Sequence, residues 1–365
     1  MLGTLASHLA LAAVATAVAG LVVLRIAHRL SLIDQANEAH KAASAQVPNV
    51  GGVAIVFGLT AGLIPLLFAS TPPEPWLLWT LAAAITLHFL GLIDDRTTLS
   101  APLKLAVQAA VAITLTTAAD IRVLTLLDDL VPFGYGLSIL ISTLWIITIC
   151  NAINFLDNMD GLSASVSTVA ALVFAASATL AGQTDVAILA AALAGGCLGF
   201  LFHNAPPARM YMGDSGSLLL GLLLAVISIQ ITYLAPGALG ELAADPLTTE
   251  VGNLQSEAGG WHAVLTPLIV LAVPLYDFLS VVILRLRAGR SPMSPDRNHL
   301  SHRLERLGLS RPTTVALITL LTLATGLSAV TLASLSGNLA LIAAGQTLAI
   351  LGLIAIFETL GPDSR

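Results

Sequence analysis

The chain has 365 residues, of which 56% are hydrophobic and only 10% are charged, with a formal net charge of −6. Because soluble domains carry about 25% charged residues, this composition excludes an ordinary soluble enzyme and predicts a polytopic membrane protein. Both cysteines, Cys150 and Cys197, fall inside apolar runs, which argues against a disulfide framework or a zinc site.

Eleven segments are apolar and come near the roughly 20 residues that a membrane-spanning helix needs. They cover about residues 4–25, 50–70, 76–93, 102–119, 137–157, 161–182, 185–203, 215–234, 262–284, 313–335 and 338–358. The first resembles a signal peptide, but its cations follow the apolar run, which is typical of a retained first helix. We therefore predict an all-α polytopic membrane protein, folded as a single domain over residues 1–365, with about eleven transmembrane helices.

The positions of lysine and arginine set the predicted orientation. With the N-terminus outside, the connections after odd-numbered spans, with the span ends that adjoin them, and the C-terminal tail hold every Lys and Arg except Arg122. The positive-inside rule then places those connections and the C-terminus in the cytoplasm. The cytoplasmic loops expected to carry a site cover about residues 26–49, 94–101, 157–161, 203–215 and 285–312. The external connection at 120–136 is compatible with a short β-hairpin.

Two adjacent acids end the third span, in the sequence Gly91-Leu-Ile-Asp94-Asp95-Arg96. Adjacent carboxylates repel one another unless a cation lies nearby, and they suit Mg²⁺, which prefers oxygen ligands and often bridges substrate phosphates. The alternative is a solvated helix end at which Arg96 neutralises the acids.

Two amides and two acids follow the fifth span at three-residue steps: Asn151, Asn154, Asp157 and Asp160. Ionisable groups at the edge of hydrocarbon are expensive to keep and usually functional. Because three-residue steps nearly stay on one helix face, we expect Asn154 and Asp157 to point into one cavity, with Asp160 reaching back. The alternative is that one of the two acids caps the next helix.

A loop with two prolines follows the seventh span, and Ser215-Gly-Ser217 then opens the eighth. Free backbone amides at such a helix start form an anion site. Asp214 is a candidate metal ligand or, alternatively, a helix cap. Tyr211 is a candidate for stacking on a base, or else an interfacial aromatic residue.

The most basic loop follows the ninth span and contains Ser294-Pro-Asp-Arg-Asn-His-Leu-Ser-His-Arg303-Leu304. Histidines three residues apart with flanking arginines fit recognition of a pyrophosphate or sugar, since arginine donates in a planar fork. The alternative is contact with anionic lipid. Asp277 and Glu358, within neighbouring spans, are candidate buried partners for an arginine.

Four motifs in this order, GLIDDR, NAINFLDNMDGL, NAPPARMYMGDSGS and SPDRNHLSHRL, together with VPNVGG at 47–52, resemble the polyprenyl-phosphate N-acetylhexosamine-1-phosphate transferases (glycosyltransferase family 4). The resemblance covers nearly the whole chain. Eleven spans and NHLSHRL are more similar to the branch that starts O-antigen, enterobacterial common antigen or teichoic-acid linkage synthesis than to phospho-MurNAc-pentapeptide translocase. The chain departs from the family pattern at Ser301 (often a third histidine), Asn158 (commonly glycine) and Ala43 (expected histidine).

The resemblance implies that undecaprenyl phosphate attacks the β-phosphate of a UDP-N-acetylhexosamine, with UDP-GlcNAc as the expected donor, and that UMP leaves. It further implies a Mg²⁺ cofactor, for which Mn²⁺ substitutes, a multi-pass location in the bacterial inner membrane, no nucleic-acid partner and a possible homodimer. The rival hypothesis is an ion-coupled transporter, although transporter sites usually lie near the bilayer midplane on broken helices.

The same resemblance implies roles for individual residues. Asp94, Asp95 and Asp157 are the candidate catalytic acids, and Asp214 is the expected metal ligand with Asp157 assisting. The expected substrate-binding residues are Lys41, Asn151, Asn154, Asp160, Asn204, Arg209, Tyr211, Arg297, His299, His302 and Arg303. Among these, Asp160 and Tyr211 are expected to contact uracil. Arg297, His299, His302 and Arg303 are expected to hold the sugar phosphate and the N-acetyl group.

Overall fold

A computed structural model describes residues 1–30, 47–125, 127–232, 261–294, 296–330, 332 and 337–359. Within these ranges the regular elements are helices, apart from one isolated parallel bridge between Asn49 and Tyr211. The helices are α1 (Leu2–Arg29), α2 (Gly51–Leu67), α3 (Pro75–Thr97), α4 (Ala101–Ala118), α5 (Leu127–Leu130), α6 (Gly134–Leu156), α7 (Leu162–Leu180), α8 (Thr184–Asn204), α9 (Gly213–Gln230), α12 (Trp261–Val270), α13 (Ala272–Arg287), α14 (Leu300–Arg306), α15 (Arg311–Val330) and α16 (Gly337–Thr359).

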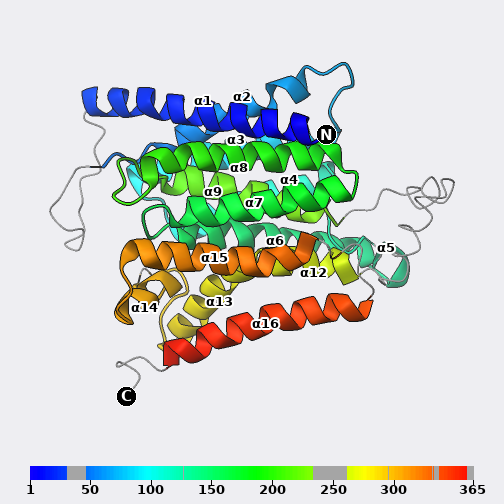
Figure 1. Cartoon of the computed structure of the whole chain (residues 1–365). Coiled ribbons are helices and arrows are strands. Elements are labelled where there is room, and N and C mark those ends of the chain that lie inside the picture. Colours follow the sequence, from blue (N-terminus) through cyan, green and yellow to red (C-terminus); the bar gives the residue numbers. More distant parts are fainter. Residues whose placement is uncertain are drawn as a thin grey trace.

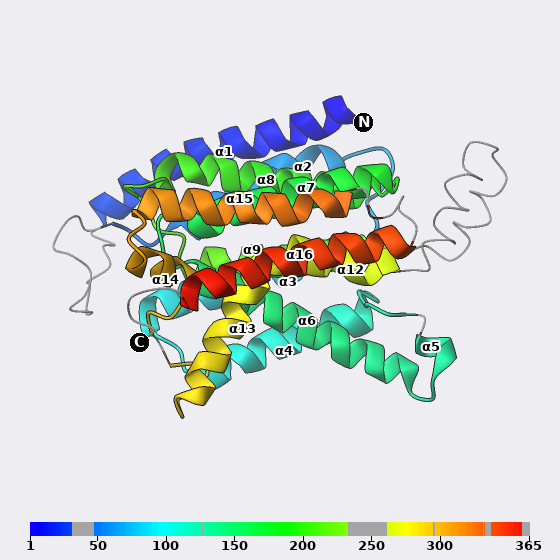
Figure 2. The ribbon, with the colours of Figure 1, turned by 60° about the horizontal axis from the view of Figure 1, so that its bottom comes forward.

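A helix occupies each of the eleven predicted segments. In the described part of the chain, 9 helices are long and apolar enough to cross a membrane, and α2 is apolar but shorter. The ninth predicted segment is divided into α12 and α13, and Figure 2 shows α13 turning away from the direction of α12. Pro274 explains the break, because it lacks the N–H that would bond to the carbonyl of Val270. The chain is a multi-pass, all-α membrane protein, as predicted.

The β-hairpin considered for 120–136 is wrong, since the described residues there form turns and the short helix α5. Side chains of α6 occupy the backbone groups that a hairpin would pair. The N–H of Val123 donates to Ser142 Oγ (2.8 Å), and its carbonyl accepts from Ser138 Oγ (2.6 Å).

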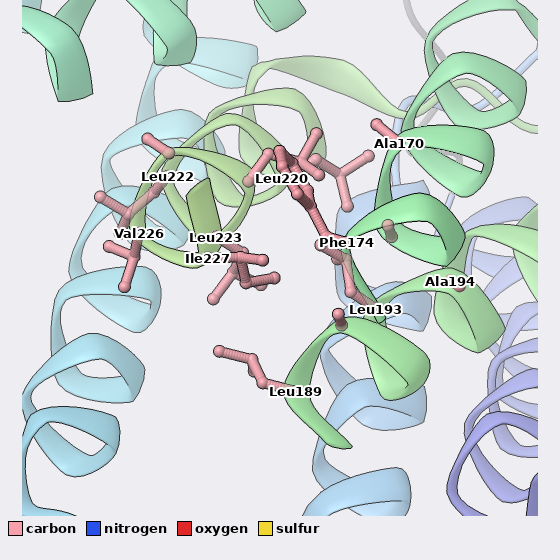
Figure 3. Packing of buried hydrophobic residues seen from close by; sticks show 14 of the residues in the cluster. Ala170, Phe174, Leu189, Leu193, Ala194, Leu220, Leu222, Leu223, Val226 and Ile227 are labelled. Carbon is pink, nitrogen blue, oxygen red and sulfur yellow. The ribbon is translucent and has the colours of Figure 1, made fainter. Parts of the chain in front are cut away.

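The core lies around α9. The most apolar window of α9 is 89% buried, whereas those of α1 and α16 are 17% and 22% buried. Figure 1 accordingly shows α1 and α16 at opposite edges of the bundle. Phe174 of α7, Leu193 of α8 and Leu223 of α9 pack together in the centre (Figure 3) and are fully buried. A helix that is apolar all round belongs in such an interior position.

Glycines bring α2 and α3 into backbone contact with the start of α9. A Cβ on Gly91 of α3, or on Gly52 of α2, would collide with Ser215. Gly213 begins α9 at φ 74°, a left-handed conformation that favours glycine. A Cβ on Gly213 would also meet the carboxylate of Asp95. The close approach therefore places the acids at the end of α3 beside the first turn of α9.

Candidate active site

Two acids from different helices share one lysine. The Nζ of Lys104, in the first turn of α4, lies 2.7 Å from Asp94 Oδ2 and 3.1 Å from Asp214 Oδ2. Asn154 of α6 donates its Nδ2 to Asp214 Oδ1 (2.9 Å). We call Asp94, Lys104, Asn154 and Asp214 the carboxylate cluster. Four helices contribute one side chain each, so the cluster exists only in the folded bundle.

Asp95 has a different role from its neighbour Asp94. Its carboxylate accepts the backbone N–H groups of Asp214 (2.9 Å) and Ser215 (3.2 Å), and also Asn49 Nδ2 (3.1 Å). The helix-start amides that we expected to bind an anion thus bind a carboxylate of the chain itself. Asp214 is not the cap of α9, because Asp95 performs that function from α3.

Lys104 was not predicted as a site residue from the sequence. The available signal was a lone lysine in an apolar helix, ten residues after Asp94. Arg96, the alternative partner for the acids, is exposed and forms no ion pair within the described residues. The cation that neutralises Asp94 is therefore Lys104.

The four polar side chains spaced three residues apart around the end of α6 do not all point in the same direction. Asn151 donates to Gln108 Oε1 (2.7 Å), and Asn154 faces the carboxylate cluster. Asp157 is the partly buried residue at which α6 ends. Asp160 accepts the N–H of Ala208 (3.0 Å) and does not cap α7 with its side chain. Asp160 therefore fastens the loop that precedes α9.

The loop between α8 and α9 is also held by Asn204. Its Oδ1 accepts the N–H of Gly161 (2.8 Å), and its Nδ2 donates to the carbonyl of Met210 (2.8 Å). The N–H of Tyr211 donates to the carbonyl of Pro48 (3.0 Å), so the VPNVGG segment lies directly beside this loop.

Arg209 is turned toward the end of α8. It is exposed, donates Nη2 to the carbonyl of Phe202 (2.7 Å), and its guanidinium lies 5.3 Å from the centre of the Phe202 ring. Lys41, expected to bind substrate, and Ala43 lie outside the described residues.

A cavity of about 320 Å³ adjoins the carboxylate cluster, within the range of roughly 300–1,000 Å³ found for small-molecule sites. Its walls come from α4, α6 and the segment between α13 and α14. The polar lining includes Lys104, Asn151, Asn154, Asn158, His299 and His302.

A buried carboxylate holds His299. Asp277 of α13 is 0% exposed and accepts His299 Nδ1 (3.0 Å) and the N–H of Leu300 (2.5 Å). Phe155 meets the imidazole edge to face, at 5.5 Å between ring centres. A carboxylate acceptor keeps a proton on Nδ1 and orients the ring, so Nε2 is left for a ligand. Asp277 therefore pairs with a histidine and not with an arginine.

Arg303 lies against α13 and α16. It bonds to Glu358 Oε1 (2.9 Å) and donates to Ser280 Oγ (2.9 Å), which confirms Glu358 as an arginine partner, although it is only partly buried. Arg303 is not among the residues that line the cavity, and Arg297 is exposed and also outside that lining. Their predicted contacts with the sugar phosphate stay predictions.

Arg285 stabilises the connection between α13 and α14. Its Nε and Nη2 bond to the two oxygens of Asp296 at 3.0 and 3.1 Å. Burial opposes ionisation of this carboxyl, but the hydrogen bonds from Arg285 and from Asn298 hold the pKa of Asp296 below its usual value. This ion pair fixes the chain that carries His299 and His302 into the cavity.

The two departures from the family pattern that the structure describes contact each other. Ser301 Oγ donates to Asn158 Oδ1 at 2.5 Å. Asn158 lines the cavity and Ser301 is buried behind it. The two positions thus form one unit in the cavity wall.

Comparison with known proteins gives consistent matches. The model of the family described as "Glycosyl transferase family 4" matches residues 77–232, which include the whole carboxylate cluster. The chain is 29% identical to a probable undecaprenyl-phosphate N-acetylglucosaminyl 1-phosphate transferase of Bacillus subtilis (strain 168), over 84% of this chain and 79% of that protein.

Two further relatives agree. A decaprenyl-phosphate N-acetylglucosaminephosphotransferase of Mycobacterium leprae (strain TN) is 34% identical, over 75% of this chain and 70% of that protein. An undecaprenyl-phosphate alpha-N-acetylglucosaminyl 1-phosphate transferase of Escherichia coli (strain K12) is 28% identical, over 81% and 75% respectively.

Proposed function

The chain belongs to glycosyl transferase family 4, and from this premise we propose that it transfers N-acetylglucosamine 1-phosphate from UDP-GlcNAc to undecaprenyl phosphate, releasing UMP. The observation that carries the proposal is the carboxylate cluster at the edge of the 320 Å³ cavity. The names of the relatives are those of transferases, which favours transfer over ion-coupled transport.

The residues of the cavity suit two phosphate-bearing substrates. Phosphoryl transfer depends on positioning and on neutralisation of charge at the phosphate oxygens. Lys104 presents an ammonium group, and His299 presents Nε2 from a ring fixed by Asp277. In this proposal Lys104 binds an oxygen of the donor pyrophosphate, and His299 and His302 hold the sugar and its N-acetyl group.

The carboxylate cluster also suits a Mg²⁺ ion. Asp94 and Asp214 already direct one oxygen each at a single cation, the ammonium of Lys104. The described residues contain no group of three or more His, Cys, Asp or Glu suited to a metal, and Mg²⁺ is commonly held by one or two carboxylates plus substrate phosphates. Asp94 and Asp214 would hold the ion, which would neutralise the pyrophosphate of the donor; Mn²⁺ would substitute.

Among the remaining acids, Asp95 has a structural role, and the roles of Asp157 and Asp160 in binding stay predictions. Asp95 is committed to the amides of α9, which makes it the weakest ligand candidate. No base is required to activate the acceptor, because a phosphomonoester with a second pKa near 6 is mostly dianionic at neutral pH. Asp157 as an assisting ligand, and Asp160 and Tyr211 as uracil contacts, stay predictions.

The proposed setting is the inner membrane of a bacterium, with the carboxylate cluster on the cytoplasmic side. A nucleotide-sugar donor is cytoplasmic and a polyprenyl acceptor is lipid-soluble, so the reaction requires a site at that interface. The product would be the first lipid-linked sugar of a cell-envelope polysaccharide. A homodimer stays a prediction.

One reconstitution tests the function. Purified protein is incubated with Mg²⁺, undecaprenyl phosphate and, in parallel, UDP-GlcNAc, UDP-GalNAc and UDP-glucose, and both UMP and lipid-linked diphosphosugar are measured. We expect equal amounts of the two products, with UDP-GlcNAc the best donor. UMP formed without the acceptor, or uptake of a solute into proteoliposomes without any UMP, would contradict the proposal.

A further inference from the structure

A second cavity, of about 470 Å³, lies between α1, α2 and α3. Its lining is apolar apart from a single charged side chain, Arg96. Val22 and Ile26 of α1, Phe57 of α2 and Leu92 of α3 form part of its walls. We call this cavity the α1–α3 groove.

The groove opens on the outside of the bundle. Ala27 and Val50 are buried at its floor, whereas Val22, Ile26 and Phe57 are exposed at its rim. In Figure 1, α1 lies at one edge of the bundle. An apolar groove at the periphery of a membrane protein faces lipid chains, and it is continuous over three helices.

The positive charge gathers at one end of the groove. Arg96 follows Leu92 by one turn of α3, and Arg29 follows Ile26 by one turn of α1. Both arginines, and Arg25 beside them, are exposed and form no ion pair within the described residues. The acids nearest to Arg96 in sequence are already engaged, Asp94 by Lys104 and Asp95 by the amides of α9.

We propose that the α1–α3 groove binds an anionic phospholipid, with one acyl chain along the three helices and the phosphate at Arg96. Basic residues between transmembrane helices bind anionic lipid head groups. The guanidinium fork matches a phosphate geometrically, and a long arginine side chain reaches from an apolar wall to the interface. The site lies in the leaflet at the end of the bundle that carries the carboxylate cluster.

Two other occupants fit the observations less well. The α1–α3 groove and the 320 Å³ cavity share no lining residue in the described part of the chain. A polyprenyl phosphate held at Arg96 would therefore keep its phosphate away from Lys104. A second copy of the chain, packed symmetrically on this face, would bring the same arginines toward one another, and like charges repel.

The test measures lipid retention and does not depend on transferase activity. Purified protein in detergent is titrated with phosphatidylglycerol or phosphatidylcholine, and bound lipid is counted by native mass spectrometry. We expect tighter binding of phosphatidylglycerol. Arg96→Gln should weaken that binding about fivefold, the factor that one arginine contributes near an anionic head group. Ala19→Phe, which fills the groove, should abolish retention of both lipids.

Matched controls are available on α1 and at the end of α13. Val18→Phe adds bulk on α1 outside the groove, and Arg287→Gln removes an exposed arginine elsewhere; both should retain lipid as the wild type does. Equal retention in wild type, Arg96→Gln and Ala19→Phe would overturn the proposal. So would binding of added undecaprenyl phosphate that Ala19→Phe abolishes, or a loss of dimers in Ala19→Phe with unchanged lipid. If Ala19→Phe fails to fold, the exposed Arg96→Gln decides.

Discussion

The two ends of the bundle each carry a cation between two acids, and they differ in what surrounds it. At one end, Arg122 bonds to Asp120 (2.6 Å) and to both oxygens of Asp128 (3.0 Å), with Tyr135 over its guanidinium at 4.4 Å. At the other end, Lys104 bridges Asp94 and Asp214. By composition alone the two clusters look alike.

The surroundings separate a structural ion pair from a reaction centre. The side chain of Arg122 is 5% exposed, and its Nε, Nη1 and Nη2 all have carboxylate partners. Lys104 is 26% exposed and lines a cavity large enough for a ligand. Each cluster pairs one cation with two carboxylates, so the charge balance does not distinguish them. A cluster of charges thus indicates function when its cation is accessible from a cavity.

The largest difference between the two ends should appear when each cation is removed. Lys104→Met keeps the length of the side chain and should lower kcat/KM for UMP release at least about a hundredfold, the usual cost of losing an electrostatic contact at a transferring group. Arg122→Met should instead destabilise the fold by about 0.5–1.5 kcal/mol, because it removes the hydrogen bonds of a buried guanidinium to two solvent-accessible acids. Turnover per folded molecule and thermal unfolding measure the two effects. Lost turnover in Arg122→Met with retained turnover in Lys104→Met would reverse the comparison.

A smaller effect is expected at Asp277, which acts on the cavity through His299. Asp277→Asn removes a charged hydrogen bond and should lower kcat/KM between about tenfold and a hundredfold, since such bonds contribute roughly 1.5–3 kcal/mol. The double variant Asp277→Asn/His299→Gln should be no slower than His299→Gln alone. Multiplying effects in the double variant would show that Asp277 acts independently of His299.

The smallest effect is expected at the Asn158–Ser301 contact, which is uncharged. A double-mutant cycle with Asn158→Ala and Ser301→Ala should give a coupling of about 0.5–1.5 kcal/mol in unfolding. Because Asn158 lines the cavity, the same variants should raise KM for the UDP-sugar more than they lower kcat. Additive unfolding energies, or unchanged KM, would exclude a shared role in the cavity wall.

The helices were predictable because each one corresponds to a continuous apolar run, which can be recognised without knowing its neighbours in space. The meeting of Asp94 with Asp214 was not, since it depends on close packing of Gly91 against Ser215, 124 positions apart by residue number. Resemblance brought these acids together as motifs without showing that Lys104 lies between them. Likewise, neither the motifs nor their spacing showed that Arg303 pairs with Glu358, which comes from the last helix.

The hairpin prediction for the external connection at 120–136 was wrong for a related reason. The sequence at 120–136 was compatible with a hairpin, but the backbone of Val123 forms hydrogen bonds with hydroxyl groups on α6. Side chains that serve a backbone from another element cannot be recognised from a local pattern. The predicted apolar helices were confirmed because burial in lipid or in the protein core stabilises an apolar helix whichever neighbours it packs against.

The most direct test of the central claim, that the carboxylate cluster is the reaction centre, is Mg²⁺-dependent UMP release by Asp214→Asn. The matched control is Asp185→Asn, because Asp185 is likewise the acid in the first turn of its helix, α8, and accepts the N–H of Glu74. Asp214→Asn should stay inserted in membranes and lose at least about a hundredfold in turnover, while Asp185→Asn keeps wild-type turnover. Near-wild-type turnover in Asp214→Asn across the Mg²⁺ titration would contradict the account.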